Sequence, residues 1–217
     1  MPNALKSKKE LAYEAIKKRI INNSLSPGGP LNEVLLARDL NTSTTPLREA
    51  LQQLQKEGFV ENVPGRGSFV SRISTQDVRE LFEIREILEC EVVKKVVANG
   101  LVREQAALAI RKEFEASGGK SRPATRGYFA PGDQIHIFIF ECFGNRRLLE
   151  YYHSLHAHIE RMRLYFFSNF HEERSEQSFT EHLEIIDALL ARDADRAEHA
   201  VRTHLQNATN YLKRITS

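Results

Sequence analysis

The sequence has no apolar run that approaches the roughly 20 residues a membrane-spanning helix requires. Near the start, Lys6, Lys8 and Lys9 precede an amphipathic stretch, and the hydrophobic block of a signal peptide is missing. Both absences argue against a membrane or secreted protein. We therefore expect a cytoplasmic protein with no membrane partner.

Cysteine is also scarce. Cys90 and Cys142 are the only two, they lie far apart, and each falls inside a helical pattern. A pair with this spacing forms neither a disulfide framework nor a zinc ribbon. We interpret both as small buried hydrophobic residues.

The motifs of common hydrolases are missing as well. The sequence contains no Gly-x-Ser-x-Gly elbow and no glycine-rich phosphate loop. The nearest approach to a metalloprotease helix motif starts at His171, but Ser175 stands where the second histidine is needed. These absences favour a protein that is not an enzyme.

What is present is typical of a globular protein of one or two domains. The chain has 217 residues, of which 41% are hydrophobic and 28% charged. Its net charge of +2 is unevenly distributed, because residues 1–75 carry 11 Lys and Arg against 7 Asp and Glu. A basic first third has the sign that contact with nucleic-acid phosphates requires.

Residues 42–58 predict one helix with a clear start and end. Hydroxyl residues precede Pro46, which a first helical turn tolerates, so the helix should start between Ser43 and Thr45. Gly58 should end it. The apolar stripe of this helix consists of Leu47, Ala50, Leu51 and Leu54. The opposite face, near the N-terminus, carries hydrogen-bonding side chains suited to reading DNA bases: Thr44, Thr45, Arg48 and Gln52.

The flanking segments predict a winged helix-turn-helix. Residues 11–22 form a first helix, and a second at about 32–40 should bury Leu35, Leu36 and Leu40. After Gly58, residues 59–63 and 68–71 are β-prone and enclose the turn Pro-Gly-Arg-Gly. This hairpin would form a wing with Arg66 at its tip.

The rest of the chain predicts helices alone. Residues 74–76 can cap a helix over 76–98, and further helices are expected at about 102–116, 131–143, 145–169, 175–191 and 193–215, with a loop at 117–127. The predicted fold is therefore mainly α. A winged helix-turn-helix domain with three helices and a hairpin wing spans residues 1–73, and an all-α bundle spans residues 74–217.

Three of the eight histidines stand on predicted apolar faces: His136, His182 and His204. A single buried histidine is usually a satisfied core residue. Three in one bundle also suit a shared metal ion, because facing helices bring ligands together in a bundle interior. Of the others, we interpret His153, His156, His158 and His171 as solvated or partly buried, and His199 as lying off its apolar stripe.

The N-terminal residues resemble a known family. The strings SLSPGGPLNEVLLARDL and STTPLREALQQLQKEGFVENVPGRGSFV are similar to the winged helix-turn-helix domain of GntR-type bacterial regulators, over residues 10–72. The resemblance implies that operator DNA contacts Ser43, Thr45, Arg48, Gly65 and Arg66. The family's frequent arginine after the serine is Thr44 here, so the base preference of this chain should differ.

The C-terminal residues resemble the FCD ligand-binding domain of the FadR-like branch of that family, in the strings FEIREILECEVV, HIFIFECFGNRRLL and HLEIIDALLARDADRAEHAVRTHL. In metal-binding members an aspartate and three histidines hold the ion, the last two 22 positions apart. The resemblance implies ligands at His136, His182 and His204. The family's aspartate position is Gly132 here, which leaves Asp133 as the candidate fourth ligand. An effector pocket is implied at Arg85, Glu89 and Asn145.

The resulting hypothesis is a homodimeric transcription regulator, with repressor the favoured role. It would bind a palindromic operator in double-stranded DNA, a divalent transition metal such as zinc or nickel, and a small carboxylate effector that a buried arginine suits. Two alternatives remain open at this point. One is a metal-dependent hydrolase with a three-histidine site, and the other is a regulator of the same family without metal.

Overall fold

The computed structural model describes residues 6–118, 131–166 and 172–216. The chain divides into two compact units, Met1–Ile73 with Arg161–Tyr165 and Ser74–Glu160 with Phe166–Ser217. None of the described helices is long and apolar enough to cross a membrane.

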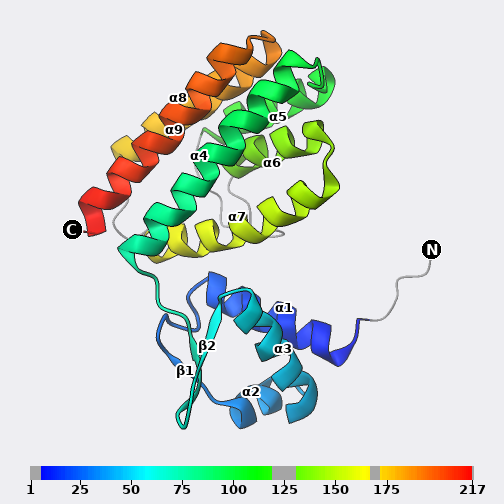
Figure 1. The fold of residues 1–217 in the computed structure, drawn as a ribbon, viewed down its shortest axis with the longest axis vertical. Coiled ribbons are helices and arrows are strands. Elements are labelled where there is room, and N and C mark those ends of the chain that lie inside the picture. Colours follow the sequence, from blue (N-terminus) through cyan, green and yellow to red (C-terminus); the bar gives the residue numbers. More distant parts are fainter. Residues whose placement is uncertain (1–5, 119–130, 167–171, 217) are drawn as a thin grey trace. The chain divides into compact units, whose positions relative to one another are not determined.

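The first unit is a winged helix-turn-helix (Figure 1). Its described elements are α1 (Lys8–Ile21), β1 (Pro30–Leu31), α2 (Glu33–Asp39), α3 (Thr44–Lys56), β2 (Val60–Val63) and β3 (Gly67–Val70). Helix α1 packs on α3. Five fully buried side chains form the centre of this core: Ile16, Ile20, Leu47, Leu54 and Phe59.

Helix α3 has the predicted limits. Ser43 is its N-cap residue, and the predicted apolar stripe is buried. Gly58 follows with φ +79°, a left-handed conformation that glycine adopts readily after a helix. Helix α1 starts earlier than predicted because Ser7 and Glu10 form a capping box ahead of the apolar residues.

The wing contains one strand more than predicted. Strands β2 and β3 pair from Val60 with Val70 to Val63 with Gly67, and Gly65 and Gly67 have positive φ in the turn, as the hairpin prediction requires. The additional strand, β1, pairs with the other side of β3, which gives the order β1-β3-β2. Pro30 is tolerated there because an edge strand does not need its missing N–H.

The prediction for α2 was wrong at Leu35, and Leu40, also predicted to be buried, is only half-buried. Leu35 is 61% exposed, whereas Leu36 and its neighbour Ala37 are buried. Asn32 caps the helix by accepting from the N–H groups of Val34 and Leu35. The helix that starts from this cap turns positions 36 and 37 inward, and Leu35 falls on the outer side.

The second unit is an all-α bundle in its described part. Its helices are α4 (Thr75–Ala98), α5 (Glu104–Ser117), α6 (Pro131–Phe143), α7 (Arg146–Phe166), α8 (Glu172–Leu190) and α9 (Ala194–Thr216). Helix α4 starts with a capping box between Ser74 and Asp77. It runs beside α9 and also contacts α6, and α8 lies along α9 (Figure 1).

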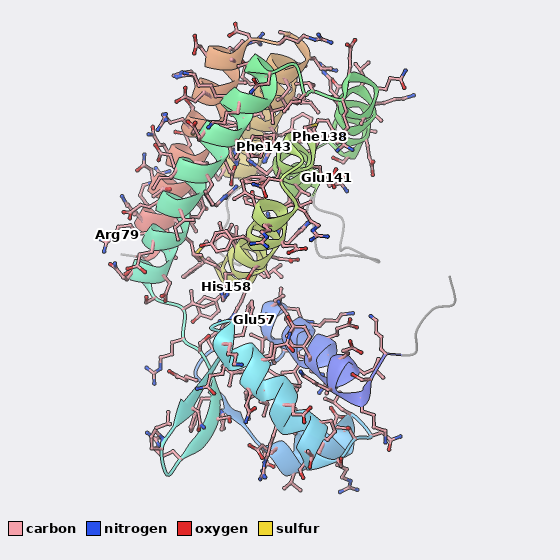
Figure 2. The ribbon with its side chains drawn as sticks, turned by 45° about the vertical axis from the view of Figure 1, so that its right-hand side comes forward. Glu57, Arg79, Phe138, Glu141, Phe143 and His158 are labelled. Carbon is pink, nitrogen blue, oxygen red and sulfur yellow. The ribbon has the colours of Figure 1, made fainter. Side chains whose placement is uncertain are left out.

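The remaining predictions for this unit differ in detail. Helix α8 starts at Glu172, ahead of the predicted residue 175. The predicted loop at 117–127 lies largely outside the described residues, as do positions 167–169 of the predicted helix. Helices α5 and α6 are tied together by Arg103, whose guanidinium lies 5.2 Å from the Phe138 ring and 2.7 Å from Glu141 Oε2; Figure 2 labels both partners.

Truncation of Leu54 tests the core of the first unit. Leu54→Ala should lower the free energy of unfolding by about 2–5 kcal/mol, because it removes a fully buried side chain and leaves a cavity. The measurement is urea denaturation of the full chain. The exposed neighbour Gln55 is the matched control, and Gln55→Ala should stay within about 0.5 kcal/mol of wild type. Equal effects of the two changes would contradict the assigned core.

Candidate functional site

The polar end of α3 is open to solvent. All the residues of this helix predicted to meet DNA are exposed, namely Ser43, Thr44, Thr45, Arg48 and Gln52. The buried stripe on the opposite side fixes the helix against α1. A helix held in this way presents its N-terminal side chains to a major groove.

The tip of the wing is also exposed. Gly65 and Arg66 lie at the turn between β2 and β3, and the Arg66 guanidinium stands 5.6 Å from the ring of Phe69. The ring supports the long side chain while its charge remains in solvent. This arrangement suits contact with a phosphate or with a groove of DNA.

Arg48 has a partner within the same unit. Its Nε donates to Glu33 Oε2 at 2.6 Å, which links α3 to α2. Arg48 is two-thirds exposed, so the pair is solvated and contributes little stability. The contact orients the guanidinium on the face that carries the other predicted DNA-contacting residues.

The three candidate histidines meet inside the second unit. His136 comes from α6, His182 from α8 and His204 from α9, and all three are buried. One ring nitrogen from each lies within 4.8 Å of the other two. His136 Nε2 and His182 Nε2 are only 3.3 Å apart. Three helices that are distant in sequence therefore bring three imidazoles to one point.

Each ring has an oxygen next to its other nitrogen. His182 Nδ1 lies 2.6 Å from the carbonyl oxygen of Ser178, and His204 Nδ1 lies 2.8 Å from Glu181 Oε2. His136 Nδ1 lies 2.7 Å from Glu89 Oε2. Oxygen acceptors at Nδ1 place the proton there and leave Nε2 with a free lone pair.

Two of the rings, those of His182 and His204, are held in the neutral form that metal binding needs. Burial, with the nearby His204 and His136 rings, keeps the pKa of His182 well below its usual range. Burial and the His136 ring lower the pKa of His204 in the same way. The neutral His182 ring, with its Nδ1 beside the Ser178 carbonyl oxygen, then directs an Nε2 lone pair toward His136 Nε2, 3.3 Å away, where one cation would be able to contact both nitrogens.

Glu89 connects the histidines to the predicted effector arginine. It is fully buried and accepts from Arg85 Nε at 2.6 Å and from the hydroxyl of Tyr152 at 2.8 Å, in addition to its contact with His136. Burial opposes ionisation of Glu89, but Arg85 and His136 outweigh it and hold the pKa of the carboxyl below its usual range. A carboxylate behind a ligand histidine fixes the ring and raises its basicity.

Two predicted site residues lie elsewhere. The group of converging nitrogens does not include Asp133, whose Oδ1 lies 3.4 Å from His156 Nε2. Its role as a fourth ligand stays a prediction. Asn145 is exposed at the start of α7, where its Oδ1 accepts from the Leu148 N–H at 3.2 Å. Its predicted contact with an effector likewise stays a prediction.

Sequence reasoning missed several partners and misplaced one histidine. His156 is buried, not solvated or partly buried, because α7 turns it inward beside Asp133. The sequence around Tyr152 and Glu181 does not mark them as site residues, because the partner of each, Glu89 and His204, lies on another helix. Ser178 was detectable in principle, because a residue four positions before His182 lies on the same helix face. His171 lies outside the described residues.

Comparison with known families gives two matches that together span most of the chain. Residues 8–70 match the model of bacterial regulatory proteins of the gntR family, and residues 80–207 match the model of the FCD domain. The three histidines, Arg85 and Glu89 all fall within the second match.

Individual proteins agree with this result. The chain is 28% identical over 204 residues to the HTH-type transcriptional repressor RspR of Escherichia coli (strain K12), which covers 94% of this chain and 88% of the relative. It is 29% identical over 187 residues to a probable D-xylose utilization operon transcriptional repressor of Paenarthrobacter nicotinovorans, covering 86% and 80%. Among solved structures, E. coli McbR/YncC superposes with a TM-score of 0.76 at 19% identity, covering 97% of this chain and 99% of that one, and so shares the fold.

The hydrogen bond from Tyr152 to Glu89 can be tested separately. Tyr152→Phe should lower the free energy of unfolding by about 1.5–3 kcal/mol, because it removes a donor to a buried charge. The neighbouring Tyr151 is 53% exposed and serves as the control; Tyr151→Phe should change stability by less than about 0.5 kcal/mol. Chemical denaturation in the presence of a chelator measures both, and an unaffected Tyr152→Phe chain would contradict the proposed polar cluster.

Proposed function

The chain belongs to the gntR family of bacterial regulatory proteins and carries an FCD domain, and on this premise we propose that it is a repressor controlled by a divalent metal and a small carboxylate. That it is a DNA-binding transcription regulator follows from the family itself, and the relatives matched here are named as transcriptional repressors. The more specific elements of the proposal are supported as follows.

DNA recognition is assigned to the open end of α3 and to the wing. The exposed side chains of Thr44, Thr45, Arg48 and Gln52 would read base edges, while Ser43, Gly65 and Arg66 would contact the backbone or a groove. We propose a homodimer, because a palindromic operator offers two half-sites about 34 Å apart that must be read together.

The metal site is assigned to His136, His182 and His204. The observation that carries this assignment is the 3.3 Å separation of two Nε2 atoms whose rings have their Nδ1 atoms beside oxygen acceptors. Neutral imidazoles in such an arrangement suit zinc or nickel. A bound ion would supply a positive charge and open coordination positions inside the bundle.

The effector is proposed to be a small carboxylate that binds near Arg85. This guanidinium is buried, and its Nε already donates to Glu89. Arginine binds carboxylates through two parallel hydrogen bonds, which gives the pair directional specificity. An effector held there lies close to the histidines through Glu89, so its binding would change the bundle and, with it, the placement of the two DNA-reading helices.

Arg48 provides the test of DNA recognition. Operator fragments are first selected with the wild-type chain from random palindromic DNA. Arg48→Ala should then weaken operator binding about 10-fold or more and relax the base preference at the position it contacts in each half-site. Lys56→Ala is the control, since Lys56 is exposed at the far end of α3. Wild-type affinity that hardly responds to salt would overturn the DNA assignment.

Metal content provides the test of the histidine site. Wild-type protein purified without chelator should retain roughly one divalent ion per chain, measured by elemental mass spectrometry, and His182→Ala should lose it. His199→Ala is the matched control because His199 is exposed on α9, the helix that also carries His204. If wild type holds no more metal than His182→Ala, the assignment is wrong.

A further inference from the structure

We propose that Gly132 determines the metal specificity of the histidine site, an inference that rests on the proposed metal function. The absence of a side chain at this position lets His182 bring its Nε2 beside that of His136. The same absence keeps residue 132 itself from supplying a carboxylate, so any carboxylate that α6 adds to the nitrogens must come from the neighbouring Asp133. The site is thereby suited to ions that prefer nitrogen donors, such as Zn²⁺, Ni²⁺ and Co²⁺, over the oxygen-preferring Mn²⁺ and Mg²⁺.

In this structure a side chain at position 132 requires the His182 ring to move. A Cβ added to Gly132 would lie 2.6 Å from both Cε1 and Nε2 of His182, and 3.0 Å from Nδ1. Real Cβ atoms essentially never approach other heavy atoms within 3.0 Å. One of the two nearest atoms is Nε2, the nitrogen that faces His136. Even a methyl group would therefore force the metal-binding edge of the ring to move.

His182 has little freedom to move away. Its Nδ1 lies 2.6 Å from the Ser178 carbonyl oxygen. The ring centroid is 4.3 Å from that of His204 and 5.4 Å from that of Phe114. The side chain is also buried, so no adjacent solvent space can accept the displaced ring. A side chain at position 132 would thus separate the converging nitrogens.

The donors that converge are three ring nitrogens, and the nearby Asp133 carboxylate lies 3.4 Å from His156 Nε2. Glu89 and Glu181 both lie at the Nδ1 edges of their histidines. Glu181 also accepts from Arg174 at 3.1 Å and from Asn207 at 2.7 Å. Such carboxylates orient the rings from behind. A carboxylate carried by residue 132 itself would need the space that the His182 ring occupies.

A double-mutant cycle between Gly132→Ala and His182→Ala tests this proposal. Zn²⁺ affinity is measured by competition with a chromophoric chelator, and the unfolding midpoint of the metal-free chain is measured in EDTA. Gly132→Ala should weaken Zn²⁺ binding about 10-fold or more and lower the midpoint, because the methyl group strikes the His182 ring. With His182→Ala already present, the ring is gone, so Gly132→Ala should leave residual Zn²⁺ binding unchanged. It should then raise the midpoint slightly, as Gly→Ala does where the backbone permits it.

The outcomes separate this inference from the proposed function. If the wild-type chain binds no Zn²⁺, the metal function fails and the inference fails with it. If wild type binds Zn²⁺ and Gly132→Ala binds it equally well, only the role of Gly132 is overturned. The role of Gly132 is also overturned if Gly132→Ala lowers the unfolding midpoint in EDTA equally in the wild-type and the His182→Ala chains. Mn²⁺ in roughly thousandfold excess should leave bound Zn²⁺ in place, and displacement would contradict the nitrogen-rich donor set.

Discussion

The second unit depends on the buried charge of Glu89. A carboxylate removed from water and left without partners costs several kcal/mol, so it can persist only where donors surround it. Arg85, Tyr152 and His136 supply the contacts, and they come from α4, α7 and α6. Apolar packing alone tolerates small shifts of one helix along another, but these polar contacts require one relative placement of the three helices.

The two units present their functional side chains in opposite ways. In the first unit, an apolar core holds α3 so that its polar end faces solvent, and the candidate DNA-contacting groups, such as Arg48, are exposed. In the second unit, the candidate metal ligands are inside, and each histidine has an oxygen at its Nδ1 edge. The surface unit needs only a stable scaffold, whereas the interior site needs correct hydrogen bonding around every ring.

Features with local sequence signals were predictable. The limits of α3 followed from Ser43, Pro46 and Gly58, and the predicted apolar faces that carry His182 and His204 are buried. The phase of α2 was not predictable, because seven residues give too little periodicity to place Leu35.

Other features depended on residues far apart in sequence. Strand β1 has two residues and exists through its pairing with β3. Tyr152 reaches Glu89 across 63 positions, which no pattern within α7 reveals. The importance of Gly132 likewise depends on a ring 50 positions away that only the fold brings to it. Helix propensity and periodicity describe residues close together in the sequence, so they cannot predict contacts between residues that are far apart in it.

The wide separation of the three histidines along the chain has a consequence for mechanical behaviour. His136 and His182 are 46 residues apart, and a metal ion shared by them would act as a reversible cross-link that closes this loop and fastens α6 to α8 and α9. An ion present at 100 times its dissociation constant would stabilise the folded bundle by about 2.7 kcal/mol. Opening of any one of the three helices would release the ion, so metal supply would set the lifetime of the folded domain as well as the occupancy of its site.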